Sequence, residues 1–210
     1  MREHHLSVSR TARYVTLGEP GPAVRETWFV LHGYGELAGA FLRQFESLDR
    51  SARLFVAPEG LSRFYLGRVA EPPAADRPVG ASWMTREDRL AEIDDYVRYL
   101  DAVCAQVSPA KKSVTALGFS QGTATVCRWA ALGSSRIDRL ILWGGEVPPD
   151  LDLKRLRVPK LTLVYGTRDE FFTTKVVAAN EARLRDQGVP YELISFEGGH
   201  AIDEETLRRL

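Results

Sequence analysis

The sequence predicts an α/β sandwich in which helices cover a mostly parallel β-sheet. Short runs of apolar and β-branched residues alternate along the chain with longer segments in which apolar residues recur every three or four positions. This alternation is typical of parallel strands that are connected by helices. The length of 210 residues suits a single domain, residues 1–210, that buries about 70% of the surface of its unfolded chain. We therefore expect one layered core.

Seven short segments are expected to be strands, because each combines apolar and β-branched residues. In chain order they are residues 12–17, 27–31, 53–57, 113–117, 139–143, 160–165 and 191–196. Helices are expected at residues 37–48, 85–107, 121–132 and 174–187, and from 203 onward. The second helix is expected to begin with Thr85 as its N-cap and to stop at Pro109, and Gly133 and Gly188 are expected to end the next two.

Residues 60–82 are expected to form an irregular loop. Gly67, Gly80 and three prolines oppose regular structure in this segment, which also contains the apolar patch Phe64, Tyr65 and Leu66. The prolines are Pro72, Pro73 and Pro78. Loops of this length are usually functional or disordered. We expect this one to pack near the functional site, and a mobile connection is the alternative.

The composition is that of an ordinary globular protein, with 44% hydrophobic and 27% charged residues. Lys plus Arg equals Asp plus Glu at 28 each, so no net positive field favours nucleic acid or anionic lipid. A small neutral or amphipathic partner is favoured. No apolar run reaches about 18 residues, and no signal peptide is evident, so we expect no membrane insertion and a cytoplasmic location. Cys104 and Cys127 are expected to be buried free thiols.

The segment Gly118-Phe119-Ser120-Gln121-Gly122 matches the pattern G-x-S-x-G between an expected strand and an expected helix. In this context a serine sits on a tight strand-to-helix turn that exposes its hydroxyl, and the flanking glycines avoid the collisions that Cβ atoms would cause there. A chance match in a glycine-rich turn is the alternative. The pattern predicts Ser120 as a nucleophile.

A serine nucleophile needs a base, and this fold supplies its partners in the chain order Ser, acid, His. His200 is the one histidine that follows Ser120, and it comes just after the last expected strand. Asp169 follows the strand 160–165 and a glycine turn, which is the expected place for the acid. Its rivals are less well placed; they are Glu170, Asp150, Asp152 and Asp186.

Acyl transfer builds negative charge on the carbonyl oxygen, which backbone N–H groups can stabilise. One donor is expected to be the amide of Gln121, at the start of the helix that follows the nucleophile. The other is expected in the turn His32-Gly33-Tyr34-Gly35, with Tyr34 as the donor. His32 is then expected to be structural, with its ring hydrogen-bonded to support the turn.

Four segments together resemble the small carboxylesterase and acyl-protein thioesterase family, which is also called phospholipase/carboxylesterase. They are Leu31-His32-Gly33-Tyr34-Gly35, Gly118-Phe119-Ser120-Gln121-Gly122, Gly166 to Asp169, and Gly199-His200. The resemblance spans residues 28–200 and implies a three-layer α/β-hydrolase sandwich that acts on esters or thioesters without a metal or an organic cofactor. In that family the oxyanion donors correspond to Tyr34 and Gln121.

The chain departs from that family at positions that concern the acyl group more than the chemistry. Glu36 stands where the family usually has Asp, and Thr123 stands where it has a second Gly. Phe171 and Phe172, with Thr173 after them, replace small aliphatic residues and Pro. Bulky side chains are candidates for a substrate pocket, and core packing is the alternative for the tryptophans; the candidates are Trp83, Trp143, Phe171 and Phe172.

These residues predict a serine carboxylesterase that forms an acyl-enzyme on Ser120. A thioesterase or lysophospholipase uses the same chemistry and stays an alternative, as does a hydrolase-like binding protein without turnover. The expected partner is a small ester or thioester, no metal is expected, and the sequence gives no indication of the oligomeric state.

Overall fold

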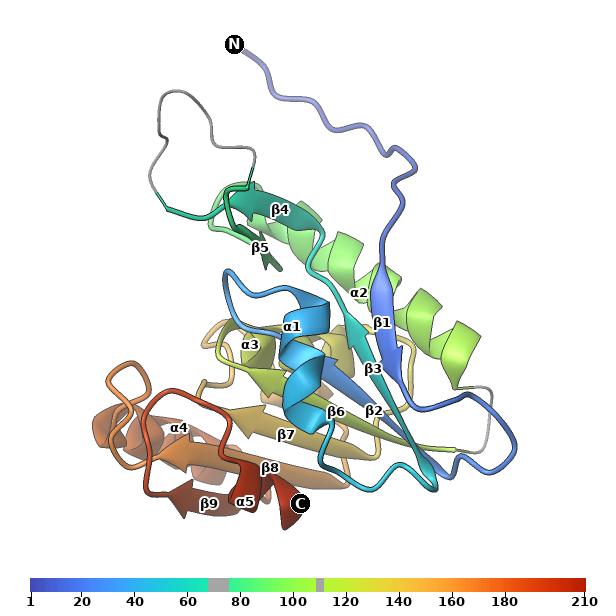
Figure 1. The fold of residues 1–210 in the computed structure, drawn as a ribbon. Coiled ribbons are helices and arrows are strands. Elements are labelled where there is room, and N and C mark those ends of the chain that lie inside the picture. Colours follow the sequence, from blue (N-terminus) through green and yellow to red (C-terminus); the bar gives the residue numbers. More distant parts are fainter. Residues whose placement is uncertain (68–75, 109–111) are drawn as a thin grey trace.

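The computed structural model describes residues 1–67, 76–108 and 112–210 (Figure 1). Seven strands form one sheet in the order β1-β3-β2-β6-β7-β8-β9. In that order they are β1 (Tyr14–Leu17), β3 (Arg53–Pro58), β2 (Glu26–Leu31), β6 (Ser113–Phe119), β7 (Arg139–Trp143), β8 (Lys160–Gly166) and β9 (Glu192–Phe196). β1 runs antiparallel to β3, and every other neighbouring pair is parallel.

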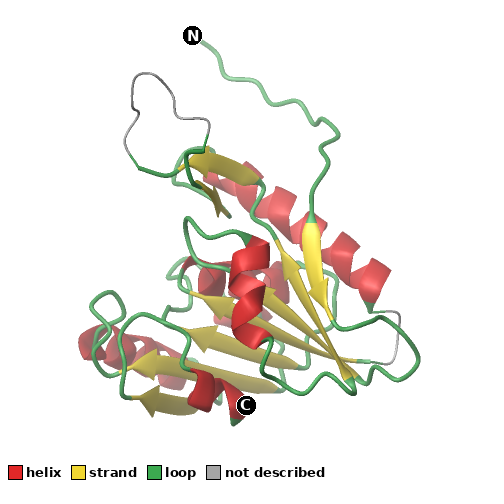
Figure 2. Cartoon of the chain, viewed as in Figure 1, coloured by secondary structure: helices red, strands yellow, loops and turns green. Residues whose placement is uncertain are grey.

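Helices cover both faces of this sheet, which gives three layers (Figure 2). One face packs against α2 (Arg89–Val107), α3 (Gln121–Leu132) and α4 (Thr174–Asp186). The other packs against α1 (Ala38–Leu42), the following 3₁₀ turn Arg43–Phe45, and α5 (Glu204–Arg208). A second 3₁₀ turn is Leu153–Arg155. The predicted α/β sandwich with a mostly parallel sheet is confirmed.

Alternation along the central strands explains why both faces are covered. In β2, Trp28 and Val30 belong to the core beneath α1, whereas Phe29 and Leu31 belong to the core beneath α2 and α3. Side chains of a strand alternate between the two faces of a sheet, so a strand that is apolar at every position must be buried on both. The apolar run at residues 27–31 therefore makes β2 a central strand.

The expectation of an irregular loop at residues 60–82 is wrong at both ends of the segment. β4 (Ser62–Tyr65) pairs antiparallel with β5 (Val79–Ser82) in a separate two-stranded sheet. Gly80 allows β5 to pack against the turn after β2, because a Cβ atom there would lie 2.4 Å from the carbonyl oxygen of Gly35. Pro72 and Pro73 lie outside the described residues.

The longest helix begins later than predicted, at Arg89 instead of just after Thr85. Asp88 precedes it with a φ of 45°, a left-handed conformation that interrupts the chain. The amide of Thr85 donates instead to the Glu92 carboxylate, at 2.6 Å. Pro109, which was predicted to end this helix, lies outside the described residues.

Candidate active site

Ser120 occupies a sharp turn between β6 and α3. Its backbone has φ 52° and ψ −117°, and the first residue of α3 follows directly. Two glycines make the turn possible. A Cβ atom on Gly118 would lie 2.2 Å from the carbonyl oxygen of Gly122, and one on Gly122 would lie 2.3 Å from that of Leu31. The glycines of the motif therefore allow α3 to pack directly on β6 and β2.

The turn that follows β2 lies against the serine and has one unused backbone donor. A Cβ atom on Gly33 would lie 3.2 Å from the Ser120 Cβ. The Gly33 amide donates to Glu36 Oε2 at 2.7 Å, the Gly35 amide donates to the Ala81 carbonyl, and the Glu36 amide donates to the Gly33 carbonyl. The amide of Tyr34 donates to no other residue in the described part of the chain.

The side chain of Gln121 is hydrogen-bonded, whereas, within the described residues, its backbone amide is not. The side-chain oxygen accepts from the Trp83 amide at 3.0 Å, and the side-chain nitrogen donates to the Met84 carbonyl at 2.8 Å. These bonds tie the end of β5 to the turn at Ser120. The backbone amide begins α3, where the first N–H groups of a helix have no partner within the helix. The Tyr34 and Gln121 amides thus remain as free donors beside Ser120.

His32 supports the turn after β2 through hydrogen bonds of its ring, as predicted. Its ring is fully buried; Nε2 accepts from the Gly60 amide at 3.0 Å, and Nδ1 contacts the Gly33 carbonyl at 2.7 Å. Because an amide can only donate and a carbonyl can only accept, the proton sits on Nδ1. Burial lowers the pKa of His32, so the neutral ring is favoured.

His200 and Asp169 form a hydrogen-bonded pair at the ends of two adjacent strands. His200 Nδ1 donates to Asp169 Oδ2 at 2.7 Å. Asp169 Oδ1 accepts the amides of Phe171 and Phe172, both at 2.8 Å, so both carboxylate oxygens are held. The Asp169 side chain is only 1% exposed, and that of His200 is 19% exposed. This carboxylate therefore orients the ring with its other nitrogen free.

Close packing of two loops brings the pair together. A Cβ atom on Gly166 would lie 2.4 Å from the Gly198 carbonyl oxygen, and the Arg168 amide donates to that same oxygen. Gly144, with a φ of +59°, leaves room for the ring, since a Cβ atom there would lie 3.2 Å from two ring atoms of His200. The loops after β7, β8 and β9 are thus fitted to one another.

The rival acids make no hydrogen bond to His200 within the described residues. Asp150 pairs with Arg89 at 2.8 Å and with Arg128 at 3.0 Å. Asp152 accepts the Lys154 amide at the start of a 3₁₀ turn. Glu170 is exposed, and Asp186 is the last residue of α4.

Ser120 and His200 line one cavity of about 400 Å³. Phe171 and Phe172 also line it, as the sequence predicted. The Phe171 ring is 77% exposed and its centre lies 5.0 Å from that of the His200 ring. Val176, Pro148 and Pro149 add further apolar surface. The cavity is thus aromatic and apolar on the side of α4.

The other two pocket candidates lie in the core instead. Trp83 is 2% exposed, stacks on His32, and donates from Nε1 to the His32 carbonyl at 2.9 Å. Trp143 is 1% exposed and donates to the Ala201 carbonyl at 2.9 Å. The expectation that they line the pocket is corrected: strand-end tryptophans are large enough to fill the core and reach a backbone acceptor there.

Several residues around the cavity were not predicted from the sequence. Glu36 holds the Gly33 amide, although the sequence marked it only as a departure from the family. Arg89, Arg128 and Asp150 line the cavity. Arg128 had one available signal, since it is the only charged residue in the helix 121–132.

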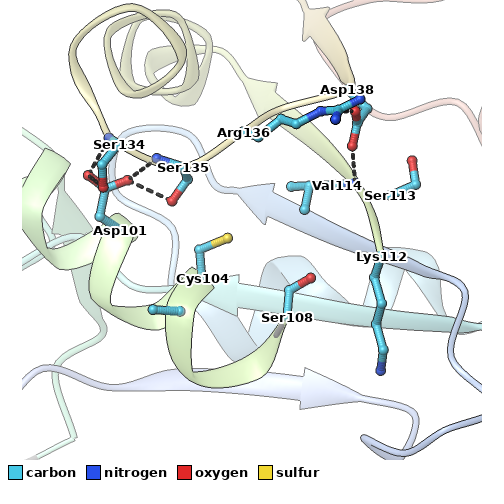
Figure 3. Close-up of a pocket in the computed structure, with 11 residues that line it drawn as sticks. Asp101, Cys104, Ser108, Lys112, Ser113, Val114, Ser134, Ser135, Arg136 and Asp138 are labelled. Carbon is cyan, nitrogen blue, oxygen red and sulfur yellow. Dashed lines mark hydrogen bonds and ion pairs between the residues drawn. The ribbon is translucent and has the colours of Figure 1, made fainter. Parts of the chain in front are cut away.

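A larger cavity, of about 660 Å³, lies at the other end of β6 (Figure 3). Its wall includes Ser113 and Val114, which begin that strand. Two carboxylates line it, Asp101 and Asp138. The Ser134 and Ser135 amides and hydroxyls donate to Asp101, as does Trp129 Nε1. This cavity offers no nucleophile and base pair, and ligands of open α/β sheets bind at the carboxyl ends of the strands.

One group of possible metal ligands comes together in the described part of the chain: Glu3, His5 and Asp88, all exposed. None of the three lines the cavity of Ser120. Exposed acidic groups commonly gather without an ion, and we assign no metal to them. In the described ranges, no helix combines the length and the apolar character needed to span a bilayer.

The chain belongs to the α/β hydrolase family. The model of this family, described as alpha/beta hydrolase fold, matches residues 29–179. No curated protein matches the sequence. The prediction of an α/β hydrolase is confirmed by this match and by the solved structures.

Three solved structures of esterase and thioesterase type share the fold over nearly the whole chain. Acyl-protein thioesterase 2 of Zea mays has a TM-score of 0.73 at 17% identity, covering 95% of this chain and 96% of that one. A carboxylesterase of Mesorhizobium loti has 0.70 at 20%, covering 94% and 93%. The Bacillus cereus carboxylesterase has 0.68 at 15%, covering 94% and 91%.

Proposed function

We propose that this chain is a serine hydrolase that cleaves carboxylic esters through an acyl-enzyme on Ser120. The observation that carries the proposal is the His200 ring, held by Asp169, on the same cavity wall as a serine in a G-x-S-x-G turn. A serine hydroxyl is a weak nucleophile, and an oriented imidazole activates it. The esterases and thioesterase with the same fold support the reaction class.

In the first step His200 Nε2 takes the proton of Ser120 Oγ as that oxygen attacks the ester carbonyl. Asp169 keeps the proton on Nδ1 and stabilises the imidazolium that forms. The negative charge on the carbonyl oxygen is held by the free amides of Tyr34 and Gln121. Collapse of this intermediate releases the alcohol, which takes its proton from His200 Nε2.

In the second step a water molecule attacks the acyl-enzyme, again with His200 as base, and the carboxylic acid leaves Ser120. Every proton passes through His200 Nε2, so the mechanism needs no metal. A thioester follows the same path with a thiol as leaving group. The Zea mays neighbour is a thioesterase by its title, and kinetics on matched ester and thioester substrates would separate the two activities.

The test is covalent labelling of the purified protein with a fluorophosphonate, followed by mapping of the modified residue. We expect labelling at Ser120, and we expect Ser120→Ala to be unlabelled, folded and inactive on para-nitrophenyl butyrate. The substitution removes only a hydroxyl. Full turnover in the variant would exclude Ser120 as the nucleophile, and a folded wild type that neither labels nor turns over would favour a binding protein without catalysis.

A further inference from the structure

A buried guanidinium lines the cavity that contains Ser120 and His200. Arg128 is only 4% exposed, and it shares this cavity wall with Arg89 and Asp150. Charged side chains are almost never buried unless they are paired. The ester chemistry proposed above makes no use of Arg128, so its position in this cavity needs a separate explanation.

The helix α3 directs Arg128 toward the serine. Ser120, Ala124 and Arg128 are spaced four residues apart, which places them on one face of a helix, and all three line the cavity. Eight residues of helix span about 12 Å. Long helical side chains lean toward the N-terminus of their helix, which shortens the gap between the guanidinium and Ser120. Ala124, between them, leaves space for a bound chain.

The hydrogen bonds of Arg128 are only partly used. Nη2 donates to Asp150 Oδ1 at 3.0 Å, and Nη1 approaches the sulfur of Met84 at 3.2 Å. A thioether is a weak acceptor, and a guanidinium has five N–H groups. Nε is buried and has no hydrogen-bond partner in the described part of the chain. Because Nε is buried, it is not the donor that meets a ligand, and the Tyr96 hydroxyl also interacts with this guanidinium. Nη1, whose acceptor is a weak thioether sulfur, is the donor that a ligand can use.

The cavity wall carries two guanidiniums and two carboxylates, and the buried charge among them is that of Arg128. Asp150 lies between two guanidiniums, with Arg89 at 2.8 Å and Arg128 at 3.0 Å, and so offsets only one of them. Both carboxylates of the cavity wall, Asp150 and Glu146, are exposed to solvent, whereas Arg128 is buried. Solvent screens an exposed charge much more strongly than a buried one. The buried end of the cavity therefore favours an anion.

We propose that this site selects esters that carry a free carboxylate, and that Arg128 is the residue that determines this specificity. The proposal rests on the proposed esterase function and adds the substrate class. A guanidinium matches the planar carboxylate and can donate two parallel hydrogen bonds to it. The ester carbonyl lies at Ser120 and the carboxylate lies at Arg128, as in a half-ester of a short dicarboxylic acid.

The experiment compares a charged and a neutral substrate of similar length in one enzyme. The para-nitrophenyl monoester of glutaric acid carries the carboxylate, and para-nitrophenyl valerate is the neutral partner. We expect wild-type kcat/KM to be higher for the glutarate ester by about tenfold or more, which corresponds to a charge-assisted hydrogen bond. A second pair, O-butyrylglycolate and its methyl ester, places the carboxylate on the alcohol side, and a preference there would also support the proposal.

Variants then assign the preference to Arg128. Arg128→Met keeps the length of the side chain and should lose the preference for glutarate while it still hydrolyses valerate. Arg128→Lys should retain part of the preference. Asp150→Asn removes the competing carboxylate and should increase the preference. The matched control, Arg136→Met, removes an exposed arginine at the other end of β6 and should leave the preference unchanged.

The outcomes separate the two proposals. The proposal is overturned if wild type hydrolyses the valerate ester at least as well as the glutarate ester and shows no preference for O-butyrylglycolate over its methyl ester. Arg128 would then only anchor Asp150. This outcome does not depend on whether Arg128→Met folds. If wild type hydrolyses no ester, the esterase proposal fails. Calorimetric titration with glutarate then tests whether Arg128 forms an anion-binding site. Binding to wild type that is weakened in Arg128→Lys and lost in Arg128→Met supports the anion site, and no binding to wild type refutes it.

Discussion

The two cavities at opposite ends of β6 differ more in chemistry than in size. The larger one contains Asp101, and five hydrogen bonds from Trp129, Ser134 and Ser135 already occupy its oxygens. The smaller one contains Ser120 beside free amides, with an oriented imidazole and a partly paired guanidinium. An oriented imidazole on the same wall as a serine, rather than volume, therefore distinguishes the candidate active site.

The largest expected effect is on kcat, and it should come from Asp169, which orients the base His200. Asp169→Asn should leave the fold intact and lower kcat by up to about 10⁴, because an amide does not fix the His200 tautomer or stabilise an imidazolium. Steady-state kinetics on para-nitrophenyl butyrate measures this. Glu170→Gln and Asp186→Asn are the controls and should keep wild-type kcat. If either of them abolished turnover while Asp169→Asn did not, the acid would be wrongly assigned.

At the other end of β6 the expected effect is on stability alone. Burial by itself would raise the pKa of Asp101, but the hydrogen bonds from Ser134, Ser135 and Trp129 outweigh it and hold that pKa below 3.8. Asp101→Ala leaves the buried Trp129 N–H without its acceptor and should reduce the free energy of unfolding by about 1–3 kcal/mol. Urea unfolding checks the loss.

The same variant should retain wild-type kcat, because β6 separates the two cavities by about 20 Å. The depressed pKa also gives the loss a pH dependence. The stabilisation by the Asp101 carboxylate is present above its unfolded pKa and disappears as the pH falls through the folded pKa, so wild type and variant should converge in acid. A kcat that fell together with stability would argue that the two ends are coupled.

A smaller effect is expected from the length of neutral acyl chains. The cavity of about 400 Å³ has bulky walls at Phe171 and Phe172, so short or aromatic acyl groups should be preferred over long ones. Each buried methylene contributes about 0.8 kcal/mol only while there is room for it. A series of para-nitrophenyl esters should therefore reach its highest kcat/KM at a short chain. A steady rise beyond about eight carbons would contradict this view of the pocket.

The smallest expected effect is on the free energy of unfolding, and it should come from Glu36. Burial raises the pKa of this carboxyl above 4.5, although the hydrogen bond from the Gly33 amide opposes the shift. The folded state thus holds this proton more tightly, and its contribution to stability is lost as the pH rises through the folded pKa. Glu36→Gln keeps an acceptor for Gly33 and does not ionise, so it should be more stable than wild type at pH 7, by less than about 1 kcal/mol. At pH 4 the difference should vanish, and thermal unfolding at the two pH values measures it.

Local patterns predicted the parts of this molecule that local sterics and burial determine. The apolar run at residues 27–31 gave a buried strand, and the glycines of the G-x-S-x-G segment gave the turn at Ser120. Chain order and strand-end position singled out Asp169 and His200, which the structure pairs. The β4–β5 hairpin escaped prediction because β5 packs closely against the turn at Gly35, a contact between segments that are distant in sequence.

The cavity wall was harder to predict, because it depends on which side of a packed side chain faces solvent. Trp83 and Trp143 were expected on that wall and lie in the core, where each reaches a backbone carbonyl. Arg128 was not singled out at all. A formal net charge of zero over the whole chain does not indicate where two guanidiniums share one carboxylate.

The left-handed backbone of Ser120 has a thermodynamic consequence. A φ of 52° is unfavourable for any residue with a Cβ atom, and such conformations store about 1–3 kcal/mol of strain. Glycine adopts this region without that penalty, so Ser120→Gly should raise the melting temperature above that of the native chain, apart from a smaller loss through the greater freedom of the unfolded glycine. Ser120, the proposed nucleophile, is therefore a residue that lowers the stability of the fold at its position.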